Sequence, residues 1–471
     1  MTAIKNPALG QGPKAGPVID DWRPEDPHFW ASIGKSVATR NLWISIPALL
    51  LAFSVWMVWS AVTVRLNSIG FSFSTDQLFW LAALPGLSGA TFRIFYSFMV
   101  PIFGGRKWTA LSTASLLIPA LWMGFAVQDV NTPYSVFVLI ALLCGFGGGN
   151  FASSMSNISF FYPKAQQGTA LGLNAGLGNL GVSVMQFCVP LVIGVGLFGA
   201  AGGNPQELAD GNQLWLQNAG FIWVPFIAAV TIAAWFGMND LSSAKASFSE
   251  QAVIFTRKHN WLMCWLYIAT FGSFIGYAAG FPLLIKTQFP GVDPLKFAFL
   301  GPLVGALVRP LGGWLADKMG GASVTLWNFV VMIAAVFGVL AFLPQGGEGG
   351  NFYGFLAMFM LLFITTGIGN GSTFRMIPVI FRTQHERASA GASAQVKEAA
   401  MKNAGKESAA VLGFSSAVAA YGAFFIPKSF GTSMALTGGP QMALYVFIAF
   451  YVSCILLTWW SYARKGAEMP C

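Results

Sequence analysis

The chain has 471 residues, of which 55% are hydrophobic and only 9% are charged, and its mean hydropathy is +0.63. Soluble proteins average about 25% charged residues, so this composition excludes a water-soluble globular protein. Apolar stretches recur from residue 41 to residue 463, and helices satisfy their own backbone hydrogen bonds within lipid. We therefore expect an all-α polytopic membrane protein.

Twelve apolar stretches reach the ~20 residues that a helix needs to cross a bilayer. They are preceded by a polar segment, 1–40, which lacks the early apolar core of a cleavable signal peptide. A short tail, 464–471, follows them. The predicted spans are 41–64, 77–102, 108–127, 134–160, 168–198, 219–237, 261–285, 294–316, 323–344, 352–378, 410–431 and 441–463.

The distribution of basic residues predicts the orientation in the membrane. Twelve spans put both termini on one side, and twenty of the Lys and Arg residues flanking the spans would lie there. Four would lie opposite: Arg65, Lys286, Lys296 and Lys428. By the positive-inside rule both termini are then cytoplasmic, and we expect a multi-pass protein of the cytoplasmic (inner) membrane. The same bias explains the net charge of +9 without any nucleic-acid partner.

No cofactor or metal site is expected. The five cysteines include no CxxC pair, and four of them lie within predicted spans. No HExxH, GxSxG or P-loop motif occurs, so an enzyme is not expected either.

Two arginines occur inside the apolar stretches, at matching points of an internal repeat. Arg93 ends the motif Gly-Ala-Thr-Phe-Arg in the second stretch, and Arg309 ends Gly-Ala-Leu-Val-Arg in the eighth, 216 positions later. In both copies a glycine pair follows, Gly104-Gly105 and Gly320-Gly321. The polar linker 238–260 separates the two copies, so we expect two pseudo-symmetric six-helix halves, 41–237 and 261–463.

Glycines repeat in the same order in both halves. The cluster at 145–149 in the fourth stretch matches the cluster at 367–371 in the tenth. Gly172 and Gly181 in the fifth stretch are nine residues apart, as are Gly413 and Gly422 in the eleventh. The offset of this last pair is larger, which we attribute to a long loop at 381–409. Six-helix halves with a site between them near the midplane are typical of transporters that rock one half against the other.

The two arginines predict an anion site. Each lies about nine residues from the cytoplasmic edge, which corresponds to ~14 Å of helix, too deep for the side chain to snorkel to the surface. An uncompensated guanidinium in hydrocarbon costs at least ~2.5 kcal/mol. No Asp or Glu lies in a span to form a buried ion pair; Asp76 and Asp317 come nearest, each at a helix end. Two guanidinium forks facing one cavity would therefore clamp a small planar oxyanion.

The titratable residues bear on energy coupling. All three histidines, His28, His259 and His385, lie outside the predicted spans, as do the acids. Proton-driven carriers usually need an intramembrane Asp, Glu or His. The sequence thus favours anion exchange over obligatory proton coupling, although tyrosine, water or the substrate could carry a proton.

The fifth stretch contains a run of glycines and two amides. Gly176, Gly178 and Gly181 match a dinucleotide-binding pattern, but that pattern requires a βαβ unit, which a membrane helix cannot supply. We expect these glycines to permit close helix packing and sliding of the halves. Asn174 and Asn179 could donate to an oxyanion.

Three aromatic residues are candidates for the same site. Phe151 follows the glycines of the fourth stretch, and Tyr267 and Phe271, four residues apart, share a face of the seventh helix. Rings on both sides of a flat anion would exclude water and fix its plane.

The segment that ends the eighth stretch, Gly313-Trp-Leu-Ala-Asp317-Lys-Met-Gly320-Gly321, resembles the loop signature of the major facilitator superfamily. A tight turn between helices is the simpler interpretation, and the same turn could latch the two halves. The first-half version, Gly104-Gly105-Arg106-Lys107, keeps the glycines but lacks the acid.

Nearly the whole chain resembles the nitrate/nitrite porters of that superfamily, of the NarK type. The resemblance includes Asp21-Trp22-Arg23-Pro24-Glu25-Asp26-Pro27, the run Gly168–Met185, Asn150-Phe-Ala-Ser-Ser-Met and Phe424-Phe-Ile-Pro-Lys. It implies that Arg93 and Arg309 bind nitrate or nitrite, that Phe151 and Phe271 sandwich the anion, and that Tyr267, Asn179 and Ser416 assist. Three alanines depart from glycines expected in the family signatures: Ala175, Ala419 and Ala423.

The sequence therefore predicts a monomeric nitrate/nitrite transporter working by alternating access, most simply as a nitrate/nitrite antiporter. A nitrate/proton symporter is the nearest alternative. An organophosphate/phosphate exchanger also uses two arginines, but it would be expected to carry further intramembrane His or Lys for a dianion.

Overall fold

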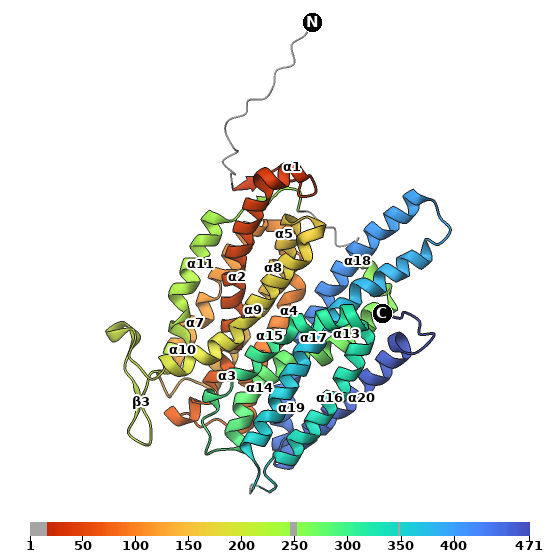
Figure 1. The fold of residues 1–471 in the computed structure, drawn as a ribbon. Helices are drawn as coiled ribbons and strands as arrows, with labels where there is room; N and C mark the ends of the chain where they lie inside the picture. The colour runs from red at the N-terminus through yellow and green to blue at the C-terminus, as the bar shows by residue number, and fades with distance from the viewer. Residues whose placement is uncertain (1–16, 245–251, 347–348) are drawn as a thin grey trace.

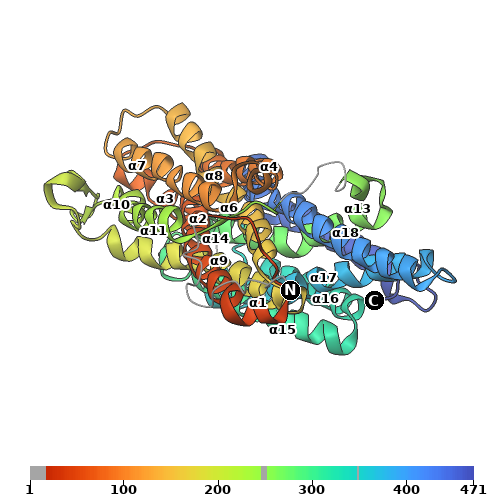
Figure 2. The ribbon, with the colours of Figure 1, turned by 90° about the horizontal axis from the view of Figure 1, so that it is seen from above.

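The computed structural model describes residues 17–244, 252–346 and 349–471. Within these ranges, twelve helices are long and apolar enough to cross a membrane, in agreement with the predicted number. They form two groups, one red to yellow-green and one green to blue, that lie side by side (Figure 1). The view from above shows the same division along the long axis of the molecule (Figure 2).

The first half contains spans one to six. Several spans are interrupted helices, because a proline or a short 3-10 turn breaks the hydrogen-bond ladder. The elements are α1 (Pro27–Phe29), η1 (Trp30–Gly34), α2 (Lys35–Met57), α3 (Trp59–Val62), η2 (Leu66–Ile69), α4 (Thr75–Tyr96), α5 (Met99–Phe103), α6 (Gly105–Ala114), α7 (Leu117–Ala126), α8 (Tyr134–Phe161), α9 (Lys164–Val192), η3 (Gly199–Gly202), α10 (Asn218–Phe221) and α11 (Trp223–Gly237).

The second half contains spans seven to twelve. Its elements are η4 (Ala252–Thr256), α13 (Lys258–Tyr267), η5 (Ile268–Gly272), α14 (Ser273–Gln288), η6 (Pro294–Lys296), α15 (Leu300–Met319), α16 (Gly321–Phe342), α17 (Phe352–Ala388), α18 (Ala394–Ala420), α19 (Gly422–Thr437), α20 (Gln441–Thr458) and η7 (Trp459–Ala463).

Two pairs of two-residue strands lie outside the helices. β1 (Val18–Ile19) pairs in parallel with β4 (Asp240–Leu241), and β2 (Gln206–Glu207) pairs antiparallel with β3 (Gln213–Leu214). The β1–β4 pair ties the start of the described chain to the end of span six, because Pro17 and Ile19 supply carbonyl oxygens to Asp240 and Ser242.

Three expectations about boundaries need correction. The first helix begins at Pro27 rather than near residue 41, because Asp26 caps it by accepting from the backbone amides of His28 and Phe29. Segment 381–409 is not a long loop: α17 continues to Ala388 and α18 starts at Ala394, and together they project beyond the other helices of the second half (Figure 1). His259 does not lie in a polar linker, because it is buried in the first turn of α13.

The repeat predicted from the glycines is visible in the packing. α4 packs on α8 in the first half as α15 packs on α17 in the second. Between the halves, α4 contacts α19, and α15 contacts α9, so each half presents its second span to the fifth span of the other. Arg93 and Arg309 lie on α4 and α15, the helices that line this interface.

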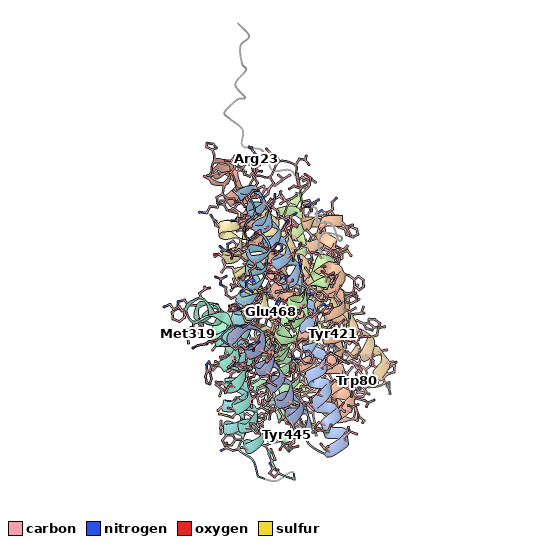
Figure 3. All side chains as sticks on the ribbon, turned by 90° about the vertical axis from the view of Figure 1, so that its right-hand side faces the viewer. Arg23, Trp80, Met319, Tyr421, Tyr445 and Glu468 are labelled. Carbon is pink, nitrogen blue, oxygen red and sulfur yellow. The ribbon has the colours of Figure 1, made fainter. Side chains whose placement is uncertain are left out.

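All side chains are drawn in Figure 3, where Arg23 lies near one end of the helices and Tyr445 near the other.

Candidate functional site

Arg93 is the most deeply buried cation of the described chain, with 0% of its surface exposed. Its Nε donates to the carbonyl oxygen of Gly148 on α8 at 3.0 Å, and its Nη1 donates to the carbonyl oxygen of Ser416 on α18 at 3.1 Å. The first acceptor belongs to the same half as Arg93 and the second to the opposite half. Nη2 is buried and has no hydrogen-bond partner among the described residues.

Glycines make this arrangement possible by letting α4 and α8 approach closely. A Cβ added to Gly148 would lie 2.7 Å from Cα of Gly89, and one added to Gly89 would lie 2.4 Å from the indole nitrogen of Trp56. In the second half a Cβ on Gly371 would lie 2.2 Å from the carbonyl oxygen of Arg309. The two glycine clusters of the repeat therefore bring backbone against backbone beside each arginine.

Arg309 lies at the equivalent point of α15 and is only partly buried. Its Cζ lies 5.2 Å from the ring centroid of Phe374, and its buried Nη1 has no hydrogen-bond partner among the described residues. No salt bridge within the described ranges includes Arg93 or Arg309, whereas Arg65, Arg106 and Arg257 each have a carboxylate partner. The buried ion pair considered from the sequence is therefore not present in the described residues.

The predicted aromatic pair lies beside Arg93. The rings of Phe151 and Phe271 face each other with centroids 6.5 Å apart and an interplanar angle of 27°. The Arg93 Cζ is 4.7 Å from the Phe151 centroid and 5.5 Å from the Phe271 centroid. One ring comes from each half, so any movement of one half against the other changes the gap between them.

Tyr267 connects the two arginines. Its ring stacks on Phe271 at 5.6 Å and 20°, and its hydroxyl is within electrostatic reach of both guanidinium groups. Tyr267 ends α13, and Phe271 lies in the π-helical turn η5, which adds a residue to the helical turn and rotates the following side chains. Such π turns occur frequently at functional sites.

The predicted polar residues occupy three different positions. Ser416 contributes its carbonyl oxygen to Arg93, while its hydroxyl donates to the carbonyl oxygen of Gly413 at 2.8 Å. Asn174 donates to Oγ of Ser154 on α8 at 2.8 Å, and its Oδ1 is buried without a partner among the described residues. Asn179 is buried with an unpartnered Oδ1, and no hydrogen bond between described residues joins it to either arginine.

The signature glycines divide into two groups. Gly178, Gly181 and Gly422 pack closely: a Cβ on Gly181 would lie 2.1 Å from the carbonyl oxygen of Leu50, and one on Gly422 would meet the backbone of Gly272 at 2.3 Å. The other three do not pack closely in this conformation, because a Cβ there would meet nothing within 4 Å. These are Gly172, Gly176 and Gly413. The three alanines at expected glycine positions, Ala175, Ala419 and Ala423, are all buried.

The two glycine-pair loops have the same backbone turn, but each is stabilised by an acidic residue from a different place in the chain. Gly104 has φ +88° and Gly320 has φ +86°, backbone angles that favour glycine. In the first half the missing acid is supplied by Asp240, whose Oδ1 accepts from the amides of Arg106 and Lys107 at the start of α6. In the second half Asp317 forms an ion pair with Arg375 on α17, and Gly321 begins α16.

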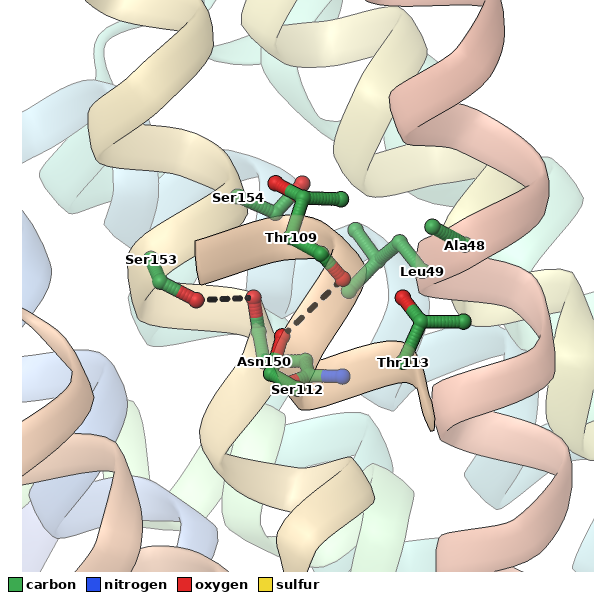
Figure 4. Close-up of a pocket in the computed structure, with 8 residues that line it drawn as sticks. All are labelled: Ala48, Leu49, Thr109, Ser112, Thr113, Asn150, Ser153 and Ser154. Atoms are coloured by element: carbon green, nitrogen blue, oxygen red, sulfur yellow. Dashed lines mark hydrogen bonds between the residues drawn. The ribbon is translucent and has the colours of Figure 1, made fainter. Parts of the chain in front are cut away.

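A separate polar cavity lies between α2, α6 and α8, lined by Ala48, Leu49, Thr109, Ser112, Thr113, Asn150, Ser153 and Ser154 (Figure 4). Its volume of about 10 Å³ is that of a single water molecule. Oδ1 of Asn150 and Oγ1 of Thr113 are buried without partners there. The cavity is too small for a polyatomic anion.

Two residues of the site were not predicted. Trp56 donates from its indole nitrogen to the carbonyl oxygen of Pro85 at 2.7 Å and lies 5.3 Å from the Arg93 Cζ. Phe374 contacts Arg309 and lies 223 positions after Phe151, one more than the 222 that separates the glycine clusters. The repeat could have identified Phe374, whereas no local pattern distinguishes Trp56 from the other 16 tryptophans.

Comparison with known proteins identifies the family of this chain. Residues 44–396 match the profile of the Major Facilitator Superfamily. The chain is 57% identical, over 95% of its length and 96% of the relative's, to the nitrate/nitrite transporter NarU of Escherichia coli. It is 43% identical, over 97% of its length and 99% of the relative's, to the probable nitrate/nitrite antiporter NarK2 of Thermus thermophilus.

The chain therefore belongs to the major facilitator superfamily and, within it, to the NarK-like porters. It is a multi-pass membrane protein, and its relatives are transporters rather than enzymes.

Proposed function

We propose that the chain is a nitrate/nitrite transporter of the cytoplasmic membrane, with both termini cytoplasmic, that exchanges external nitrate for internal nitrite by alternating access. One observation carries this proposal: Arg93 and Arg309 each keep a buried N–H group without a partner, and no carboxylate of the described chain neutralises them. A small planar oxyanion would accept from both groups, because a guanidinium presents a planar fork of donors.

The aromatic residues support an anion that is flat. The ring centroids of Phe151 and Phe271 are 6.5 Å apart, which is about two van der Waals contact distances. A planar nitrate or nitrite would therefore fit between the rings after small side-chain movements. A tetrahedral phosphate is thicker and carries a second charge, which favours nitrate over the organophosphate alternative.

The anion also explains why the halves would move. Without it, two cations lie within electrostatic reach of the same residue, Tyr267, and their mutual repulsion opposes closure. When the anion is bound, it screens the two positive charges, and the halves can close around the site. One chain contains both halves, so we propose that it acts as a monomer.

Counterflow in proteoliposomes tests the clamp. Arg93→Lys and Arg309→Lys are expected to lose most nitrate uptake driven by internal nitrite, because an ammonium lacks the fork. Arg382→Lys, on the exposed end of α17 where Arg382 pairs with Glu386, is the matched control and should keep wild-type uptake. Near-normal uptake by both Lys variants of the site would overturn the proposal.

The same vesicles distinguish the alternatives. Stimulation of nitrate uptake by internal nitrite without a pH change is expected for exchange. Internal acidification that requires nitrate would instead identify proton symport, and stimulation by internal phosphate would identify the phosphate exchanger.

A further inference from the structure

A cavity of about 310 Å³ lies outside the arginine site, on the perimeter of the first half. It is enclosed by the beginnings of α2 and α6 and by the end of α11. Its lining residues are Pro17, Arg40, Arg106, Trp235, Phe236, Gly237, Met238 and Asn239. Because α2 and α6 begin, and α11 ends, on the side of the membrane where the chain starts, the cavity lies at one membrane–water boundary.

One wall of the cavity is basic. Arg40 is exposed, and Nη2 of Arg40 donates to the neutral Oδ1 of Asn239 at 2.7 Å. No salt bridge between described residues includes Arg40. Arg106 is buried, pairs with Asp240 at 3.3 Å, and has its Cζ 5.0 Å from the ring centroid of Trp235. Among the described residues, two arginines and one aspartate leave this wall with a net charge of +1, which Arg40 carries.

The other wall is apolar and faces outward. Phe236 is 81% exposed and Trp235 is 46% exposed, although both lie at the end of a membrane-spanning helix. Side chains this apolar are exposed at such a position because they contact acyl chains rather than water. A site with one basic wall and one wall in contact with acyl chains suits an amphiphilic ligand that has an anionic headgroup.

We propose that this cavity binds one anionic phospholipid, with the phosphate of its headgroup on Arg40 and an acyl chain along Phe236. Arginine suits this role because its fork matches phosphate oxygens and because basic pockets between helices at the cytoplasmic face bind anionic headgroups. The site is distinct from the arginine clamp, since Arg40 and Arg106 belong to α2 and α6 and face the perimeter rather than the interface between the halves.

Native mass spectrometry of the full chain tests the proposal. The protein is delipidated in detergent and titrated with phosphatidylglycerol or with zwitterionic phosphatidylcholine. We expect wild type to retain one phosphatidylglycerol at activation energies that remove all phosphatidylcholine. Arg40→Gln should weaken that binding about tenfold, the effect of losing a charge-assisted contact of ~1.4 kcal/mol. Arg382→Gln, an exposed cation elsewhere, is the matched control and should bind as wild type.

Two further arms distinguish the source of the phosphate. Phe236→Ser removes the acyl contact and leaves both arginines, and it should also weaken retention of phosphatidylglycerol. Inorganic phosphate at the lipid concentration should not displace the lipid. Equal retention by wild type and Arg40→Gln would overturn the proposal. Displacement by inorganic phosphate, or unchanged retention by Phe236→Ser, would overturn its assignment to a lipid.

Discussion

Lys428 on α19 donates a hydrogen bond to Oδ1 of Asp76 on α4 at 2.7 Å, which joins the two halves of the molecule. A second ion pair, Arg65 to Asp293 at 2.8 Å, joins them in the loops after spans one and seven. Asp76 and Asp293 each lie at the beginning of the second span of their half. Both pairs lie at the end of the molecule opposite the termini, so they join the halves at that end.

Removing the Lys428–Asp76 pair is expected to open that end more often. The side chains are 22% and 35% exposed, so the pair contributes about 0.2–1 kcal/mol, and Asp76→Asn should increase the open population by roughly 1.5- to 5-fold. Distances between spin labels on the two halves measure this population. The charge-swapped double variant Asp76→Lys, Lys428→Asp should restore the wild-type distribution; if it behaves like the single variant, the pair is not a latch.

Alanine at Gly148 is expected to destabilise the protein by about 1–3 kcal/mol, because its Cβ would lie 2.7 Å from Cα of Gly89. Alanine at Gly172 has nothing within 4 Å and should raise stability by up to about 1 kcal/mol through helix propensity. Thermal unfolding in detergent compares the two. A loss of stability at Gly172 as large as that at Gly148 would contradict the packing described above.

Transport by the Gly172→Ala and Gly176→Ala variants should fall even though neither is less stable. Both positions are open in this conformation, and we expect them to meet the other half when the molecule rocks. Counterflow rates at saturating nitrate test this expectation, with Gly405→Ala, another glycine with nothing within 4 Å, as the control. Wild-type rates in both variants would exclude contact at these faces.

The acid that contacts the first glycine-pair loop, Asp240, should matter more for stability than Asp317 beside the second loop. Asp240 and Arg106 are nearly buried, so Asp240→Ala leaves an unpaired buried charge and should cost about 3 kcal/mol. Asp317 and Arg375 are about half exposed, and Asp317→Ala should cost below about 1 kcal/mol. Chemical or thermal unfolding measures both; equal losses would refute this difference.

Glu468 makes a small pH-dependent contribution to stability. The hydrogen bond from Lys258 lowers the pKa of Glu468 below its ordinary 4.5. A lowered carboxyl pKa stabilises the fold above the ordinary pKa, and the contribution disappears as the pH falls through the lowered value. Because Glu468 is about half exposed, we expect less than about 1 kcal/mol. The difference in melting temperature between wild type and Glu468→Gln should therefore be present at pH 7 and shrink below pH 4; a constant difference would contradict it.

The number of spans, the repeat and the two arginines could be predicted because each follows from hydropathy or from residue spacing alone. The early start of the first helix could not, since a capping Asp26 followed by Pro27 lies in a polar segment without an apolar pattern. The length of α17 and α18 was missed for the same reason: their projecting ends are polar, and hydropathy detects only the part of a helix that lies in lipid.

Contacts between residues far apart in the sequence, and local distortions of helices, could not be predicted from the sequence. Asp240 replaces the acid absent from the first glycine-pair loop, but it lies 134 positions from Arg106 and no spacing rule connects them. The π turn around Phe271 depends on packing against neighbouring helices rather than on a local motif. The residue type of Asn174 alone suggests a donor to an oxyanion. Its hydrogen bond to Ser154 depends on the rotation of α9 about its axis, which the spacing of the glycines does not determine.

The two arginines are chemically alike but mechanically different. Arg93 is tethered to a carbonyl oxygen of each half, Gly148 on one side and Ser416 on the other, whereas no such cross-half bond between described residues restrains Arg309. Any separation of α4 from α18 must release the Ser416 carbonyl and leave Nη1 of Arg93, in addition to Nη2, without an acceptor. Under the proposed function, each movement of one half therefore changes how many hydrogen bonds Arg93 can donate to a bound anion, so the affinity for that anion would depend on the conformation of the transporter.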